Sequence, residues 1–269
     1  MNVYEGAAMN NLPIRWCAIG DSFTYLNDHL DETGYRLHRG YLSRTQDKLP
    51  EYPLELINVG INGSSFRDWI TQSIPEADIY TVLLGTNDWH QGRPVGSETD
   101  LKKRNAGTIL GCLGILTDRI RSVSPDAPVI GANPVERADF VYLLDPFNNA
   151  RGSYAPENGV LLKDLSRDIL SAYKTLGAEP LDLWNLSGFT QKKLVRFKRV
   201  RKNGVYEDLP YPDYIGIPFD PRTDEYPYPP EAVSLTYDGL HPSDEGAEIL
   251  AELFAERIRL ILGQRKERK

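Results

Sequence analysis

The stretch Trp16-Cys17-Ala18-Ile19-Gly20-Asp21-Ser22-Phe23 decides how the rest of the chain is interpreted. It is a short apolar run followed by a glycine, an acid and a serine. Short apolar runs that end at a glycine are typical of buried strands. Open α/β sheets place their chemistry beyond the carboxyl ends of their strands. We therefore expect Ser22 to be a nucleophile, and the rest of the chain to supply a base, an orienting carboxylate and donors for an oxyanion.

Four further stretches read as strands, and helical patterns alternate with them. The strands are expected at 54–59, 78–84, 127–132 and 180–184, and the helices at 41–49, 66–74, 99–123, 158–176 and from 243 to about 262. Two segments, 24–40 and 136–156, are expected to be irregular. Strands that alternate with helices form a parallel sheet covered on both faces. The sequence therefore predicts a single α/β domain spanning 1–269.

The alternation stops at a proline-rich insertion, 188–234, in which no helix is expected. Within it, 194–206 predicts a hairpin that turns at Asn203-Gly204. Long segments of this kind are usually lids, binding loops or partner surfaces. The basic run 192–202 is interpreted as a solvated hairpin face, or as a contact for an anion or for a neighbouring subunit of a homo-oligomer. The aromatic residues of 140–154 and 211–228 could stack on sugars, line an acyl pocket or simply pack.

The composition limits the classes of function. The chain has 269 residues and a net charge of −7, which argues against nucleic-acid binding because that needs a basic face. Cys17 and Cys112 lie in apolar stretches and are interpreted as buried thiols. No histidine or cysteine pair has the spacing of metal ligands, so no metal site is expected. No apolar run approaches the roughly 18 residues that span a membrane, and Met1–Asn11 does not resemble a signal peptide, so we expect a cytoplasmic protein without membrane contact.

The search for a base is short, because the sequence contains four histidines: His29, His38, His90 and His241. Only His241 has a carboxylate placed close to it in the sequence, in Asp238-Gly239-Leu240-His241. A tight turn can bring Asp238 back against the imidazole and leave the other side of the ring free to meet Ser22. His90 could contact a substrate, but is interpreted as a surface-loop histidine.

Two other expected strand ends carry groups that can donate to an oxyanion. Gly63 can present its backbone N–H at close range because it has no side chain. Asn87 can present its side-chain amide. Because the carboxyl ends of parallel strands gather at one edge of a sheet, both groups should converge with Ser22.

Three neighbouring residues compete for roles in this site. Gly60 is an alternative backbone donor, but is interpreted as the residue that forms the turn. Asp21 and Asp88 are interpreted as structural carboxylates, and Asp88 is expected to accept backbone N–H groups near the site.

Four motifs resemble, in order, the four blocks of the SGNH (GDSL-type) hydrolase superfamily: Gly20-Asp21-Ser22, Asn58-x-x-x-x-Gly63, Gly85-x-Asn87-Asp88 and Asp238-x-x-His241. The resemblance implies an ester hydrolase on a flavodoxin-like three-layer α/β/α sandwich, with a five-stranded parallel sheet and no cofactor. It implies that Ser22 is the nucleophile and that Asp238 and His241 are the acid and the base. It also implies an oxyanion hole formed by Ser22, Gly63 and Asn87. The sequence departs from the pattern in two places: phenylalanine follows the serine where the family has leucine, and the segment before Asp238 is long.

The expected reaction is ester hydrolysis through an acyl-enzyme. Short-chain esters, above all O-acetyl groups on carbohydrates, are the favoured substrates. Lysophospholipid or acyl-thioester hydrolysis is the alternative, and it would need a long apolar trench. Acyl transfer to a sugar hydroxyl and a non-catalytic binding module are further alternatives. An ordinary α/β-hydrolase is disfavoured because the stretch 20–24 lacks the final glycine of the G-x-S-x-G elbow.

Overall fold

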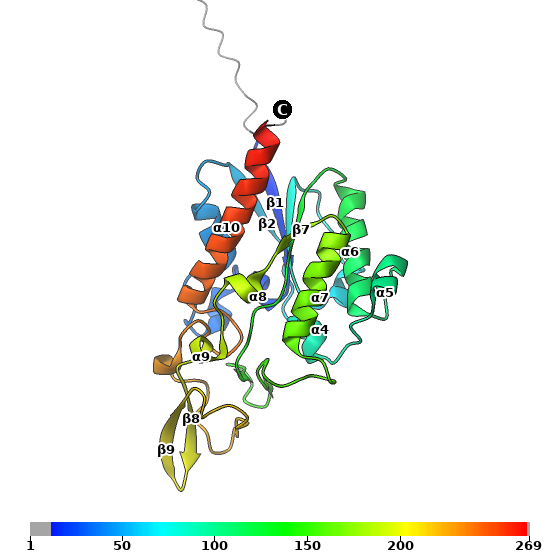
Figure 1. Ribbon diagram of the computed structural model, residues 1–269. Coiled ribbons are helices and arrows are strands. Elements are labelled where there is room, and N and C mark those ends of the chain that lie inside the picture. The colour runs from blue at the N-terminus through cyan, green and yellow to red at the C-terminus, as the bar shows by residue number, and fades with distance from the viewer. Residues whose placement is uncertain (1–11, 268–269) are drawn as a thin grey trace, which may run out of the picture.

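The computed structural model describes residues 12–267, and it is built around one parallel sheet (Figure 1). The sheet has five strands in the order β2-β1-β3-β4-β7. All four neighbouring pairs are parallel. The strands are β1 (Ile14–Gly20), β2 (Leu54–Asn58), β3 (Ile79–Leu83), β4 (Val129–Ala132) and β7 (Glu179–Leu181). The expectation about a signal peptide in Met1–Asn11 lies outside the described residues.

Helices lie on both faces of this sheet, as predicted for a three-layer α/β/α sandwich (Figure 1). On one face α10 packs against α2, and on the other α6 packs against α3, α5 and α7. The α-helices are α1 (Ser22–Tyr25), α2 (Tyr41–Asp47), α3 (Phe66–Trp69), α4 (Thr86–His90), α5 (Glu98–Lys103), α6 (Ile109–Val123), α7 (Leu162–Thr175), α8 (Leu183–Leu186), α9 (Gln191–Leu194) and α10 (Asp244–Glu267).

The central strand β1 shows why the sheet is covered twice. Successive side chains of a strand point to opposite faces. Trp16 and Ala18 join the core beneath α10, whereas Cys17 and Ile19 join the core beneath α6. Every one of these side chains is buried, so β1 reads as a continuous apolar run in the sequence.

One helix prediction is wrong, because 99–123 forms two helices. The first, α5, ends at Arg104, which takes the left-handed conformation with φ 55°. The second, α6, is capped by Thr108, whose hydroxyl accepts the N–H of Gly111 at 3.2 Å. The connection packs tightly on α6, since a Cβ on Gly111 would lie 1.9 Å from the carbonyl oxygen of Asn105. Apolar spacing continues across this break, and therefore does not reveal it.

The segments expected to be irregular also contain short regular elements. The first starts with α1 and includes a 3₁₀ turn, and the second forms a small antiparallel hairpin. The insertion holds α9 and another 3₁₀ turn, although no helix was expected there. These elements are η1 (Leu30–Thr33), β5 (Phe140–Val141), β6 (Asn149–Ala150) and η2 (Pro230–Ala232).

The predicted hairpin in the insertion is confirmed, although it spans 197–210 instead of 194–206 because the first predicted residue belongs to α9. Strands β8 (Phe197–Lys202) and β9 (Val205–Pro210) pair antiparallel. Asn203 and Gly204 form the turn, with φ values of 52° and 83°. The hairpin projects from the end of the molecule at which the sheet strands terminate (Figure 1). The last helix is longer than expected and continues to the end of the described chain.

Two simpler expectations can also be compared with the fold. Cys17 and Cys112 are both free and buried. Within 12–267, no helix has the length and apolar character needed to cross a membrane.

Candidate active site

The candidate nucleophile lies where the central strand becomes a helix. Ser22 is the first residue of α1, directly after β1, and Asp21 caps this helix by accepting the N–H of Phe23 at 3.1 Å. The turn is tight, because a Cβ on Gly20 would lie 2.0 Å from Oγ1 of Thr24. A glycine followed by a capping acid therefore fixes the position of the serine.

The structure joins Ser22, His241 and Asp238 in one chain of hydrogen bonds. The Oγ atom of Ser22 lies 2.8 Å from Nε2 of His241, and Nδ1 of the ring lies 2.6 Å from Oδ2 of Asp238. The other carboxylate oxygen accepts the N–H groups of Leu240 at 3.0 Å and His241 at 2.7 Å. All three candidate residues are buried. A neutral imidazole that donates to the carboxylate can accept the serine proton at Nε2.

The turn that carries Asp238 and His241 is held by the segment around β5. Gly239 has φ +89°, and a Cβ there would lie 2.0 Å from the carbonyl oxygen of Asp139. Ala138 N–H donates to the carbonyl of Gly239 at 2.8 Å, and Val141 N–H donates to that of Asp238 at 3.0 Å. The backbone of 138–141 thus fixes the turn on one side.

Aromatic rings surround the imidazole of His241. Phe140 meets it edge-on at 5.7 Å, Tyr237 stacks on it at 5.8 Å, and Phe23 approaches at 5.9 Å. These contacts restrict rotation of the ring and exclude water from most of its surface.

The two glycines after β2 differ in the way their N–H groups are used. Gly60 donates to Oδ1 of Asn58 at 3.0 Å, which fits its interpretation as a turn residue. Gly63 is exposed, has φ +72° and, within the described residues, donates to no partner. Its N–H is therefore available to a ligand.

The side chain of Asn87 lies between two groups of the site. Its Nδ2 donates to the carbonyl of Ser64 at 2.9 Å and makes a longer contact of 3.5 Å with Oδ2 of Asp21. The bond to Ser64 fixes the amide, and the long contact leaves the second N–H weakly engaged.

The two acids interpreted as structural are both buried. Asp88 accepts the N–H of Phe66 at 3.0 Å, as expected, and burial raises its pKa to about 6. Burial also raises the pKa of Asp21 to about 7, against the lowering effects of the Phe23 N–H and of His241. Neither is bonded to the imidazole of His241.

The remaining histidines contact other groups. His29 stacks on Tyr25 at 3.8 Å, and His38 pairs with Asp244 at 2.6 Å. His90 is exposed in α4 rather than in a loop, and lies 3.7 Å from Glu157. Within 12–267 no cluster of three or more metal-ligating side chains occurs.

A buried ion pair connects the insertion to the candidate site, and the sequence reasoning missed it. Lys198 of β8 lies 3.3 Å from Oδ2 of Asp139, and both are buried. The other carboxylate oxygen accepts Gly152 N–H at 2.9 Å and Tyr154 O–H at 2.6 Å. The reading of 192–202 as a solvated face is therefore wrong for Lys198. Strand alternation, which turns Lys198 and Val200 inward together, is the only signal that could have indicated it.

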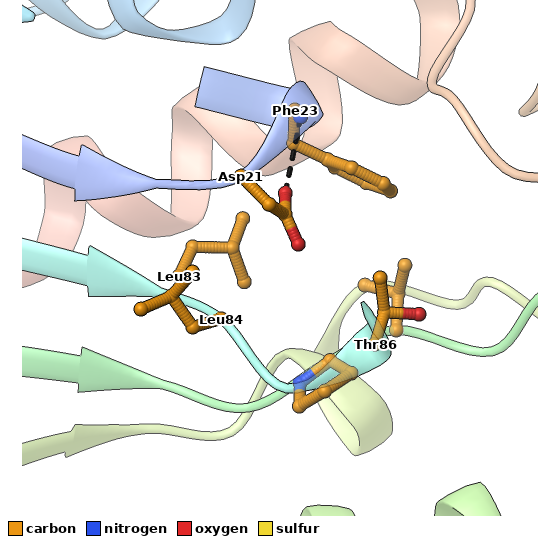
Figure 2. A pocket seen from close by; sticks show the side chains of 7 residues that line it. Asp21, Phe23, Leu83, Leu84 and Thr86 are labelled. Atoms are coloured by element: carbon orange, nitrogen blue, oxygen red, sulfur yellow. Dashed lines mark hydrogen bonds between the residues drawn. The ribbon is translucent and has the colours of Figure 1, made fainter. Parts of the chain in front are cut away.

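Two small cavities lie at the site. One lies between Asp21 and the ends of β3 and β4; Figure 2 shows the Asp21 carboxylate and the Phe23 ring at its wall. The other lies beside His241. It is lined by Leu26, Glu32, Asn62, Tyr142, Leu143, Tyr237, Asp238 and His241.

A family model of GDSL-like lipase/acylhydrolase proteins matches residues 18–194. The crystal structure of a possible lipase from Chitinophaga pinensis DSM 2588 is 43% identical, with a TM-score of 0.88, and the match covers 92% of this chain and 98% of that one. This chain belongs to the GDSL-like lipase/acylhydrolase family. Members of this family are ester hydrolases, and the resemblance found in the four sequence blocks is thereby confirmed.

Other solved structures share the fold of this GDSL-family hydrolase at low identity. The lipase/acylhydrolase of Enterococcus faecalis is 14% identical with a TM-score of 0.53, over 91% of this chain and 95% of that one. The acetyl xylan esterase AlAXEase is 17% identical with a TM-score of 0.51, over 91% and 100%. A search of curated proteins gave no match.

Proposed function

We propose that this GDSL-family hydrolase is a serine esterase that removes short acyl groups, above all acetyl groups, from carbohydrate hydroxyls. The observation that carries the proposal is the hydrogen-bonded chain from Ser22 through His241 to Asp238. Ser22 lies near the start of the sequence and the other two residues lie near its end. Even so, each of the two contacts, Ser22 to His241 and His241 to Asp238, is 2.8 Å or shorter.

In the proposed reaction Ser22 Oγ attacks the ester carbonyl while His241 Nε2 takes the hydroxyl proton. Asp238 holds the ring in the required tautomer and stabilises its positive charge. The imidazolium then gives its proton to the departing alcohol oxygen, which leaves an acyl-serine. A water molecule, activated by His241, hydrolyses this intermediate and restores the serine.

The negative oxygen of the tetrahedral intermediate needs hydrogen-bond donors. We assign this role to the N–H groups of Ser22 and Gly63 and to the amide of Asn87. The free N–H of Gly63 and the fixed amide of Asn87 support the assignment. Donors held in place before the reaction stabilise the charge without reorganising.

The lining of the cavity beside His241 favours a polar alcohol. Glu32, Asn62 and two tyrosines line this cavity, and their polar groups can meet the hydroxyls of such an alcohol. The similar Chitinophaga pinensis protein is described as a possible lipase, so long-chain ester hydrolysis is the second candidate.

The test combines a nucleophile variant with a series of 4-nitrophenyl esters from acetyl to dodecanoyl. Ser22→Ala should lower kcat by several orders of magnitude while the circular dichroism spectrum stays unchanged, because the attacking oxygen is lost. The wild type should prefer acetyl. A preference for eight carbons or more would support the lipase candidate instead. A folded protein that a fluorophosphonate does not label at Ser22 would indicate a non-catalytic binding module.

A further inference from the structure

Glu32 places a carboxylate in the cavity beside His241. It belongs to η1, and its side chain is one-third exposed. Its Oε1 accepts the hydroxyl of Tyr25 at 2.8 Å, and Tyr25 in turn stacks on His29. The carboxylate is thus oriented from one side, and its second oxygen accepts no hydrogen bond from the described residues.

Glu32 and Asp238 are the carboxylates on the wall of this cavity, and Nδ1 of His29 lies 3.7 Å from Oε1 of Glu32. Tyr142 and Tyr237 line the same cavity, and the pKa of each is raised, first by burial and then by the negative charges of Glu32 and Asp238. The positive charge of Arg36, whose guanidinium donates to the carbonyl of Tyr228, acts in the opposite direction on Tyr237. A negatively charged ligand in this cavity would face the carboxylates of Glu32 and Asp238 on its wall.

The proton transfer from His241 indicates which part of the substrate lies next to Glu32. The imidazole of His241 must deliver its proton to the alcohol oxygen, so that oxygen has to approach Nε2 within hydrogen-bond distance. An alcohol part that extends past His241 into the cavity that this residue lines would meet Glu32 and Asn62.

We propose that Glu32 is a specificity-determining residue that selects esters of neutral polyols: its free carboxylate oxygen accepts hydrogen bonds from alcohol-side hydroxyls and repels anionic alcohols such as uronates and sugar phosphates. This inference rests on the proposed function, since it assigns the alcohol side of the same site. A hydrogen bond to a charged group is stronger than a neutral one and contributes roughly 10- to 100-fold to binding.

The test uses Glu32→Gln, which keeps the shape of the side chain and removes the charge. Three acetyl esters are compared: mono-O-acetylated methyl glucoside, the same ester of methyl glucuronide, and 4-nitrophenyl acetate as the reference for acyl chemistry. Relative to that reference, the variant should lose about tenfold in kcat/KM on the glucoside, mainly through KM, and gain about tenfold on the glucuronide. The control Glu98→Gln, which removes an exposed carboxylate on α5, should keep the wild-type ratio.

Two results would overturn the inference: a glucoside-to-glucuronide ratio that Glu32→Gln leaves unchanged, or equal losses on all three esters, which would indicate a structural role. A wild type that hydrolyses none of the esters would overturn the proposed function instead. In that case, calorimetric binding of methyl glucoside and methyl glucuronide still decides the inference. The wild type should prefer the neutral glycoside, and Glu32→Gln should lose that preference.

Discussion

Asp21 and Asp238 are both buried beside Ser22 and His241, but they differ in the number of donors they meet. Asp238 accepts two backbone N–H groups and the ring N–H of His241. Asp21 accepts one backbone N–H and a long amide contact, and burial raises its pKa to about 7. A buried carboxylate keeps its charge only where donors replace the water that it has lost. The carboxylate next to the serine in sequence is therefore poorly suited to stabilise a cation, and the distant one is well suited.

The largest expected effect comes from removing the charge at Asp238. Asp238→Asn should lower kcat by about 10⁴-fold, because an amide no longer fixes the tautomer of His241 or stabilises its positive charge. Steady-state kinetics with 4-nitrophenyl acetate measures the loss, and thermal unfolding checks that the variant folds. A variant that keeps a tenth of the wild-type rate would show that the charge of Asp238 is not needed.

A third buried carboxylate, Asp139, differs from both because it is paired with a cation, the ammonium of Lys198. Lys198→Met should lower the free energy of unfolding by about 3–5 kcal/mol, because it leaves the Asp139 charge buried without its cation. Lys202→Met is the matched control on the same strand, since Lys202 is exposed and pairs with Glu207 at the surface. That change should cost less than about 1 kcal/mol. Equal losses for the two variants in urea unfolding would contradict the assignment of Lys198 to a buried pair.

A third effect is expected at Asp21, and it depends on pH. The carboxyl loses its proton near 3.8 when unfolded and near 7 when folded, so between these values the folded state binds more protons. The contribution of this group to stability is therefore complete below pH 4 and is lost as the pH rises toward 7. Asp21→Asn should remove that loss. The free energy of unfolding of the variant, measured with urea, should therefore rise relative to that of the wild type between pH 4 and pH 8. A pH-independent difference would contradict the raised pKa.

Much of the fold could be predicted because local patterns determine it. The strands are apolar runs with turn residues at their ends. The strand β1 can be recognised in the sequence because its residues 16–19 are buried on both faces of the sheet and are therefore apolar throughout. The chemical groups stand at those ends, so parallel topology brings Ser22 and Asn87 to one edge. The same reasoning could not locate the break at Arg104, where a residue other than glycine takes a left-handed conformation.

Long-range polar contacts were the other part that the sequence concealed. Lys198 stands in a basic run in which its neighbours Lys192 and Lys202 are exposed, and its burial beside Asp139 distinguishes it. Glu32 sits in a polar loop with no motif around it. Such residues acquire their roles from packing between distant segments, and no spacing along the chain encodes that packing.

Gly239 has a consequence for how this esterase can diversify. In the Asp238-x-x-His241 block it occupies a position that looks like a spacer, open to substitution. Its backbone conformation and the carbonyl of Asp139, 2.0 Å from where a side chain would begin, leave room for hydrogen alone. Substitutions that change the preference for an alcohol are therefore expected on the wall of the cavity, around Glu32 and Asn62, and not at this position of the turn.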